Sequence, residues 1–287
     1  MAQPPMNAYQ HLERRFARIA AIGDALGILG WDQQTMMPDG AADGRGEQTA
    51  TLSVLAHEML TAPEVGDWLA EAEREGGLDP VQAANLREMA RDHRHATAVP
   101  SDLVEAVTKA TTRCEMVWRT ARADSDFAAL LPSLAEVLRL TRETAAAKAA
   151  AFGLTPYDAL LDQYDPGARG ERIDTVFDAL AADLPDLIRR VIDRQAADPA
   201  PVAPSGPFPV DRQKALGETL MRQAGFDFAR GRLDVSLHPF CGGATGDVRI
   251  TTRYDEADFT SSLMGVLHET GQFVACSGFC IRNAKQQ

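Results

Sequence analysis

The chain has 287 residues, of which 45% are hydrophobic and 24% charged, as expected for a globular protein with one large domain or two modest ones. This composition excludes a disordered chain, and four cysteines are too few for a scaffold held by disulfides. The formal net charge of -12 disfavours binding to nucleic acid or to an anionic membrane surface. The first residues lack a secretory signal and no stretch of about 18 apolar residues occurs, so we expect a cytoplasmic protein.

Helical periodicity begins near residue 8 and dominates the chain. Apolar side chains such as Leu12 and Phe16 recur every three or four residues over 8–29, which lines one face of a helix. Asp79 before Pro80 is a capping side chain followed by a proline whose missing N–H costs nothing at a helix start. The same periodicity predicts further helices over roughly 50–60, 64–75, 80–95, 101–122, 127–151, 172–196 and 211–229.

Two segments break the helical pattern. Residues 197–210 contain five prolines, which cannot donate backbone hydrogen bonds, so we expect a surface connector there. Further on, Leu233 and Val235 alternate with polar residues, a glycine-rich turn follows, and Val248 and Ile250 alternate again. This pattern predicts a small antiparallel β hairpin immediately before the last helix. The predicted fold class is therefore mostly α with a minor sheet.

The last predicted helix begins near Asp255 and carries a His-Glu pair. In a His-Glu-x-x-His helix, two imidazoles four residues apart bind one zinc ion and the glutamate acts as general base. Here His268 and Glu269 are in place, but the fifth position is Gln272. A neutral amide oxygen is a weaker zinc ligand than an imidazole nitrogen, so the motif is incomplete.

Several segments, in order along the chain, resemble the motifs of one family. They are Trp31-Asp32, Met37-Pro38 and Arg45 near the N-terminus, residues 157–162, then His238-Pro239-Phe240 and Asp247-Val248-Arg249-Ile250-Thr251, and finally the helix from Gly265 to Gly271. Together they resemble the carboxypeptidase Taq family, the thermostable metallocarboxypeptidases with a His-Glu-x-x-His zinc helix. The resemblance runs from about Leu12 to Gly271.

This resemblance implies a zincin-like, mostly helical peptidase fold related to the angiotensin-converting enzymes and neurolysin. It also implies one divalent metal, zinc or cobalt, in a deep cleft, and a homodimer. Family members hydrolyse peptides and release C-terminal amino acids, so the implied partners are the C-termini of peptides, with no nucleic acid and no membrane.

The resemblance also implies roles for particular residues. His268 would be a metal ligand and Glu269 the catalytic general base. His238 and Arg249 are candidates for the substrate cleft, with the alternative that they brace the hairpin against the zinc helix. Gln272 stands where the second histidine ligand is expected.

The chain departs from the family pattern after Gly271. The third ligand, a glutamate that family members supply well downstream, does not occur before the last residue, and neither do the later family motifs. We therefore expect one metallocarboxypeptidase domain over 1–271, a non-family tail over 272–287, and a missing C-terminal part of the fold. A frameshift or truncation would explain the tail, and a divergent but selected C-terminus is the alternative.

With one strong ligand in place of three, we expect weak or absent metal binding and little or no activity. Two other hypotheses stay open. One is a non-catalytic helical module that binds peptides or a partner, and the other is a functionless truncated gene product.

Overall fold

The computed structural model describes residues 6–200, 202 and 204–284, with 273–284 as backbone only. The elements are α1 (Ala8–Thr35), a short 3-10 helix (Asp39–Ala41), α2 (Ala42–Thr61), α3 (Pro63–Glu75), α4 (Pro80–Thr97), α5 (Ser101–Ala123), α6 (Phe127–Phe152), α7 (Pro156–Tyr164), α8 (Gly170–Ala196), α9 (Val210–Gln223), β1 (Gly231–Val235), β2 (Cys241–Ala244), β3 (Asp247–Thr252) and α10 (Phe259–Ala284). The predicted mostly helical fold class is confirmed. None of the described helices is both long enough and apolar enough to cross a membrane.

The described chain divides into two compact units, 1–138 with 206–287, and 139–205. The second boundary falls inside the predicted proline-rich connector, between the end of α8 at Ala196 and the start of α9 at Val210. The predicted tail, 272–287, lies largely outside the residues whose side chains are described.

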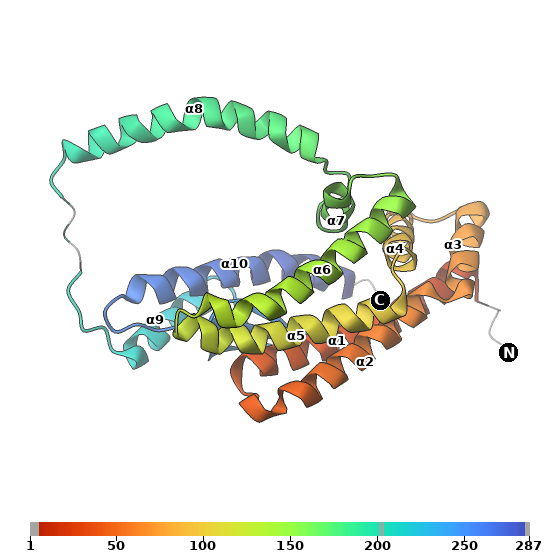
Figure 1. The fold of residues 1–287 in the computed structure, drawn as a ribbon, viewed down its shortest axis with the longest axis horizontal. Coiled ribbons are helices and arrows are strands. Elements are labelled where there is room, and N and C mark those ends of the chain that lie inside the picture. The colour runs from red at the N-terminus through yellow and green to blue at the C-terminus, as the bar shows by residue number, and fades with distance from the viewer. Residues whose placement is uncertain (1–5, 201, 203, 285–287) are drawn as a thin grey trace. The chain divides into compact units, whose positions relative to one another are not determined.

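In the first unit, α1 packs on α2 and α2 on α5, and Figure 1 shows these helices together. Arg45 on α2 bonds the Leu29 carbonyl oxygen on α1 at 2.6 Å and pairs with the Asp32 carboxylate at 2.5 Å. Two of the family-like motif positions, Asp32 and Arg45, therefore join two helices.

Apolar side chains from α1, α3 and α4 form a buried cluster. Tyr9 and Leu12 on α1, Val65 and Leu69 on α3, and Leu86 on α4 are all buried against one another. Burying each large apolar side chain contributes roughly 1.5–3 kcal/mol. The predicted cap at the start of α4 is present, since the Asp79 carboxylate accepts bonds from the backbone N–H groups of Val81 and Gln82.

The sheet has three strands in the order β1-β3-β2, and it corrects the predicted hairpin. The strand β1, predicted as the first arm, pairs with β3 in parallel, and Leu233 stands beside Ile250. The antiparallel arm is the short strand β2, which contains Gly242 and Gly243, two glycines of the predicted turn. A parallel pair needs a longer connection than a hairpin, and here residues 236–246 supply it and hold β2.

The sheet, α9 and α10 share one core. Met221, Phe226, Leu233, Ile250 and Val266 form a buried cluster across these elements, and Ile250 is fully buried. This core fixes the position of α10 relative to the sheet, and α10 carries the His-Glu pair.

The second unit contains the end of α6, α7 and α8. Lys148 is buried on α6 and donates a hydrogen bond to the Gln163 side chain on α7, and burial lowers the pKa of Lys148. The Asp158 carboxylate accepts a bond from the Gly170 N–H at 2.8 Å and so caps α8. No residue of α8 is buried.

Candidate functional site

The helix α10 begins at Phe259, four residues after Asp255, where the last helix was predicted to begin. The Asp258 carboxylate accepts hydrogen bonds from the backbone N–H and the hydroxyl of Thr260, and these bonds lower the pKa of Asp258. Asp255 instead accepts the N–H of Ala257 at 2.8 Å and closes the turn before the helix. The helix begins at Phe259 because Asp258 is the residue that caps its free N–H groups.

Two polar side chains hold the first turn of α10 in place. The Gln213 amide on α9 donates to the carbonyl oxygens of Phe208 at 2.7 Å and Asp255 at 2.8 Å. Its carbonyl oxygen accepts the buried Ser262 hydroxyl at 2.7 Å. This network joins α9, the preceding turn and α10, and so fixes the direction in which the helix leaves the sheet.

The helix α10 packs closely against the His-Pro-Phe segment. A Cβ atom at Gly265 would lie 3.6 Å from the Pro239 ring and 3.6 Å from the Thr252 hydroxyl. These are ordinary van der Waals distances, so the backbone of α10 at Gly265 lies directly beside Pro239 and Thr252. The His-Glu pair follows one turn later on the same helix.

His268 and Glu269 lie on different sides of α10. Val266, Glu269 and Thr270 are buried, with Glu269 8% exposed, whereas His268 and Gln272 are exposed. The Gln272 amide nitrogen stands 3.0 Å from His268 Nε2, so the two side chains share one face and touch. Residues four apart on a helix are neighbours, which explains this contact.

The donors in place do not fit a zinc centre. Zinc sites use three or four protein ligands, chiefly imidazole, thiolate and carboxylate. In the described part of the chain, no group of three His, Cys, Asp or Glu side chains is arranged to hold a metal ion. Gln272, which lies next to His268 at the position of the second ligand, has a neutral amide side chain.

The predicted cleft residue Arg249 contacts Asp247 on β3 and Trp31 on α1. Its guanidinium bonds both carboxylate oxygens of Asp247, at 2.7 and 2.5 Å, and lies 4.3 Å from the centre of the Trp31 ring. The bond from Arg249 holds the pKa of Asp247 below its ordinary value. These contacts join β3 to α1, whereas the predicted brace was against the zinc helix, so both predicted roles of Arg249 stay predictions.

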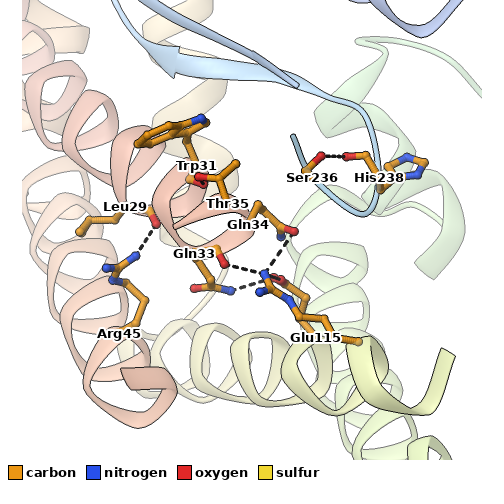
Figure 2. Close-up of polar contacts among 10 residues, drawn as sticks. Leu29, Trp31, Gln33, Gln34, Thr35, Arg45, Glu115, Ser236 and His238 are labelled. Carbon is orange, nitrogen blue, oxygen red and sulfur yellow. Dashed lines mark hydrogen bonds and ion pairs between the residues drawn. The ribbon is translucent and has the colours of Figure 1, made fainter. Parts of the chain in front are cut away.

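His238, the other predicted cleft residue, lines a cavity of about 660 Å³ between α1, α5 and the sheet. The His238 carbonyl oxygen accepts the Ser236 hydroxyl at 2.7 Å, which fixes the loop that carries the ring (Figure 2). Trp31 and Trp118 form apolar walls of this cavity. We refer to this space as the His238 cavity.

A polar network at the His238 cavity was not predicted from the sequence. Arg119 donates to the Gln33 carbonyl oxygen at 2.6 Å and to the Glu115 carboxylate at 2.7 Å (Figure 2). The Gln33 amide donates to the other Glu115 oxygen at 2.8 Å. Only the four-residue spacing of Glu115 and Arg119 on one helix signals this pair in the sequence. The buried Trp31 Nε1 has no hydrogen-bond partner in the described structure.

The comparison with known proteins agrees with these motifs. The family model of the carboxypeptidase Taq (M32) metallopeptidases matches residues 11–274. The chain is 35% identical to thermostable carboxypeptidase 1 of Thermus thermophilus over 284 residues, covering 93% of this chain and 54% of that protein. It is 31% identical to thermostable carboxypeptidase 1 of Pyrococcus furiosus, covering 90% of this chain and 52% of that protein.

The fold of this chain also resembles solved structures of metallocarboxypeptidases. Metallocarboxypeptidase 1 of Trypanosoma cruzi superposes with a TM-score of 0.81 at 43% identity, covering 92% of this chain and 53% of that one. The chain spans about half the length of the relatives it matches. On the family match over most of its residues, the chain belongs to the carboxypeptidase Taq (M32) metallopeptidases.

Proposed function

We propose that this chain is the N-terminal and central part of a metal-dependent carboxypeptidase that releases C-terminal amino acids from peptides. The observation that carries the proposal is the family match over residues 11–274, which includes the His268-Glu269 pair on α10. The packing of α10 on Pro239 supports it, because this contact sets the pair close to the sheet.

In this proposal His268 would be a ligand of a zinc or cobalt ion, which would activate a water molecule, and Glu269 would be the general base beside it. We further propose that the chain as it stands has little or no peptidase activity. The support is chemical, since Gln272 replaces the second imidazole and the described residues offer no group of three metal-binding side chains.

The geometry of α10 allows a direct test of the ligand assignment. Two imidazole nitrogens bound to one tetrahedral zinc at 2.0–2.1 Å lie roughly 3.3 Å apart. The side-chain nitrogens of His268 and Gln272 are 3.0 Å apart, so a histidine at position 272 can reach the same ion. We expect Gln272→His to bind Zn²⁺ at least about tenfold more tightly than the original chain, since even outer-shell losses cost roughly 10- to 100-fold.

The measurement is isothermal titration with Zn²⁺, and with Co²⁺ followed by its visible absorption. The matched controls are Gln272→Asn and the double variant Gln272→His, His268→Ala, and neither should gain affinity. Equal binding by Gln272→His and Gln272→Asn would show that His268 is not a metal ligand.

Activity is tested on the original chain with a peptide that has a free C-terminus and with the same peptide amidated. We expect no metal-dependent release of amino acids from either. Release from the free C-terminus at the rate of an ordinary metallopeptidase would refute the proposed inactivity and support the proposed reaction.

The remaining expectations stay predictions. They are the relation of the fold to angiotensin-converting enzyme and neurolysin, a homodimer, a cytoplasmic location, and the alternative of a non-catalytic peptide-binding module. Sedimentation of the purified chain would measure the oligomeric state.

A further inference from the structure

A cavity of about 520 Å³ lies where β1 and β3 end. These two strands are parallel and Val235 pairs with Thr252, so the residues that follow both strands leave the sheet side by side. The ends of α1 and α5 complete the wall, and no described residue of α10 lines the space. We refer to it as the arginine cavity, and it is separate from the His268-Glu269 pair.

Three arginines line the arginine cavity, and none of the described residues that line it is acidic. Arg119 is paired with the Glu115 carboxylate at 2.7 Å. Arg122 and Arg253 are exposed, and neither makes an ion pair with a described residue. The cavity therefore carries two uncompensated positive charges, in a chain whose net charge is -12. Such a local excess of positive charge favours an anionic ligand.

The helix ends beside the cavity cancel little of this charge. The C-terminal end of a helix is negative because its last carbonyl oxygens lack partners. At the end of α5, the carbonyl oxygens of residues 120–122 accept the backbone N–H groups of residues 124–126, and the carboxylates of that turn do not line the cavity. At the end of α1, the Gln33 carbonyl oxygen accepts a bond from Arg119.

Two positive charges suit a phosphate monoester better than a carboxylate. A phosphate monoester carries about 1.5 to 2 negative charges at pH 7 and three acceptor oxygens, whereas a carboxylate carries one charge and two oxygens. The planar guanidinium group presents parallel N–H donors that match phosphate oxygens. Arg122 comes from the last turn of α5 and Arg253 from the residue after β3, so they approach the space from two elements and can contact different oxygens of one phosphate.

The rest of the wall suits a flat apolar group. Trp118, Val235 and Leu237 line the cavity, and Val235 and Leu237 are each more than half exposed. Apolar and aromatic side chains beside a few polar groups are typical of small-molecule sites, and a tryptophan ring stacks well on another ring. Tyr254 adds a hydroxyl, and burial raises its pKa to about 12, so this group stays a hydrogen-bond donor at neutral pH.

We infer that the arginine cavity binds a phosphate monoester attached to a flat aromatic group, as in a nucleoside monophosphate or an aryl phosphate. Arg122 and Arg253 hold the phosphate, and Trp118 and Leu237 cover the aromatic group. The inference goes beyond the proposed peptidase function and requires neither a bound metal nor hydrolysis, so each can fail without the other.

The test is isothermal titration of the full chain with phenyl phosphate, benzoate, inorganic phosphate and adenosine monophosphate, each in the millimolar range. Phenyl phosphate and benzoate share the ring, so their comparison isolates the anion. We expect phenyl phosphate to bind roughly tenfold more tightly than benzoate, because it makes an additional charge-assisted contact. It should also bind more tightly than inorganic phosphate, which has no ring. Binding should weaken as salt rises from about 0.05 to 0.5 M, because exposed charges are screened over that range.

Adenosine monophosphate distinguishes the two sources of this chemistry. Tighter binding than phenyl phosphate would identify a nucleotide as the ligand, and weaker binding would identify a smaller aryl phosphate. Both results support the inference.

Removal of the two free charges is the decisive change. The double variant Arg122→Gln, Arg253→Gln should bind phenyl phosphate roughly ten- to hundredfold more weakly, because each charge-assisted hydrogen bond contributes strongly. Arg18→Gln, at an exposed arginine of α1 that does not line the cavity, is the matched control and should leave binding unchanged.

The apolar wall is tested by Trp118→Leu, which should weaken the binding of phenyl phosphate roughly two- to tenfold and leave that of inorganic phosphate unchanged, since only the ring contact is lost. Leu237→Ser is the second variant, because the exposed Leu237 can be changed without opening the core. Urea unfolding of every variant checks that the fold is retained.

Four results would overturn the inference. The original chain binds neither phenyl phosphate nor adenosine monophosphate, or the double variant binds phenyl phosphate as tightly as the original chain does. Benzoate that binds as tightly as phenyl phosphate would show a carboxylate site. Inorganic phosphate that binds as tightly would show a plain anion site and refute the role given to Trp118 and Leu237.

Discussion

The contact between α1 and β2 at Gly27 gives a sharp prediction about packing beside the His238 cavity. A Cβ atom built on Gly27 would overlap the carbonyl oxygen of Gly243 and stand 3.1 Å from the carbonyl carbon. Both atoms belong to the backbone, so no side chain can rotate away. Gly243 is also held in place, because its φ of +101° is a conformation that glycine adopts readily and other residues rarely do.

Gly23, one turn earlier on α1, is the matched control. No atom lies within 4 Å of a Cβ at Gly23, which is exposed. Alanine there gains the helix propensity alone, about 0.8–1.0 kcal/mol. At Gly27 the same gain is opposed by an overpacking cost of roughly 1–3 kcal/mol or more. We therefore expect Gly27→Ala to be less stable than Gly23→Ala by about 1–3 kcal/mol.

The assay is urea unfolding of both variants, followed by circular dichroism, with the midpoint and the slope fitted separately. If Gly27→Ala proves as stable as Gly23→Ala, α1 does not pack on the Gly243 backbone, and the described wall of the His238 cavity is wrong.

Three further predictions concern the core, the sheet and α8. Because Ile250 is fully buried, Ile250→Ala should lower the free energy of unfolding by about 2–5 kcal/mol and Ile250→Val by about 0.5–1.5 kcal/mol, measured in urea melts. A loss below about 0.5 kcal/mol for the alanine variant would contradict the burial of Ile250. The bond from Arg249 lowers the pKa of Asp247. The ionised Asp247 carboxylate therefore stabilises the fold above its ordinary pKa of 3.8, and this stabilisation is lost as the pH falls below that value. In Asp247→Asn the free energy of unfolding should fall less steeply with decreasing pH, and identical acid melts of the two proteins would refute the pairing. Finally, α8 exposes eight large apolar side chains. The double variant Leu180→Ser, Leu187→Ser removes two of them, so the fluorescence of a bound hydrophobic dye should fall by roughly a quarter. Unchanged fluorescence would mean that another surface binds the dye.

Local patterns in the sequence predict most of the helices, since helix formation depends on neighbours three and four residues apart. Asp79 illustrates this, because the cap and the proline that follows it mark the start of α4 correctly. The short helix α7 was not predicted, although its start has a signal. Thr155 precedes Pro156 and accepts the N–H of Asp158 at 3.1 Å, but nine residues are too few to show a clear period.

The pairing of strands is less local, and the prediction failed there. Adjacent strands usually form a hairpin, so Leu233 and Ile250 were assigned to opposite arms of one. The structure instead places β1 and β3 in parallel and sets β2 on the other side of β3. Burial of Leu233 and Ile250 with Met221 of α9 accompanies this arrangement, and no pattern within the strand segments indicates that contact.

The order of the motifs in the sequence was enough to identify the family and to single out His268, Glu269 and the substituted Gln272. These assignments need only the identity and spacing of residues on one helix. The two cavities depend on tertiary structure, because their walls join residues far apart in the chain. Gln33 bonds Glu115 from 82 positions away, and Arg122 and Arg253 share a cavity only because α5 ends where β1 and β3 end. Side-chain periodicity records which face of an element is buried, but it carries no information about which distant element covers that face.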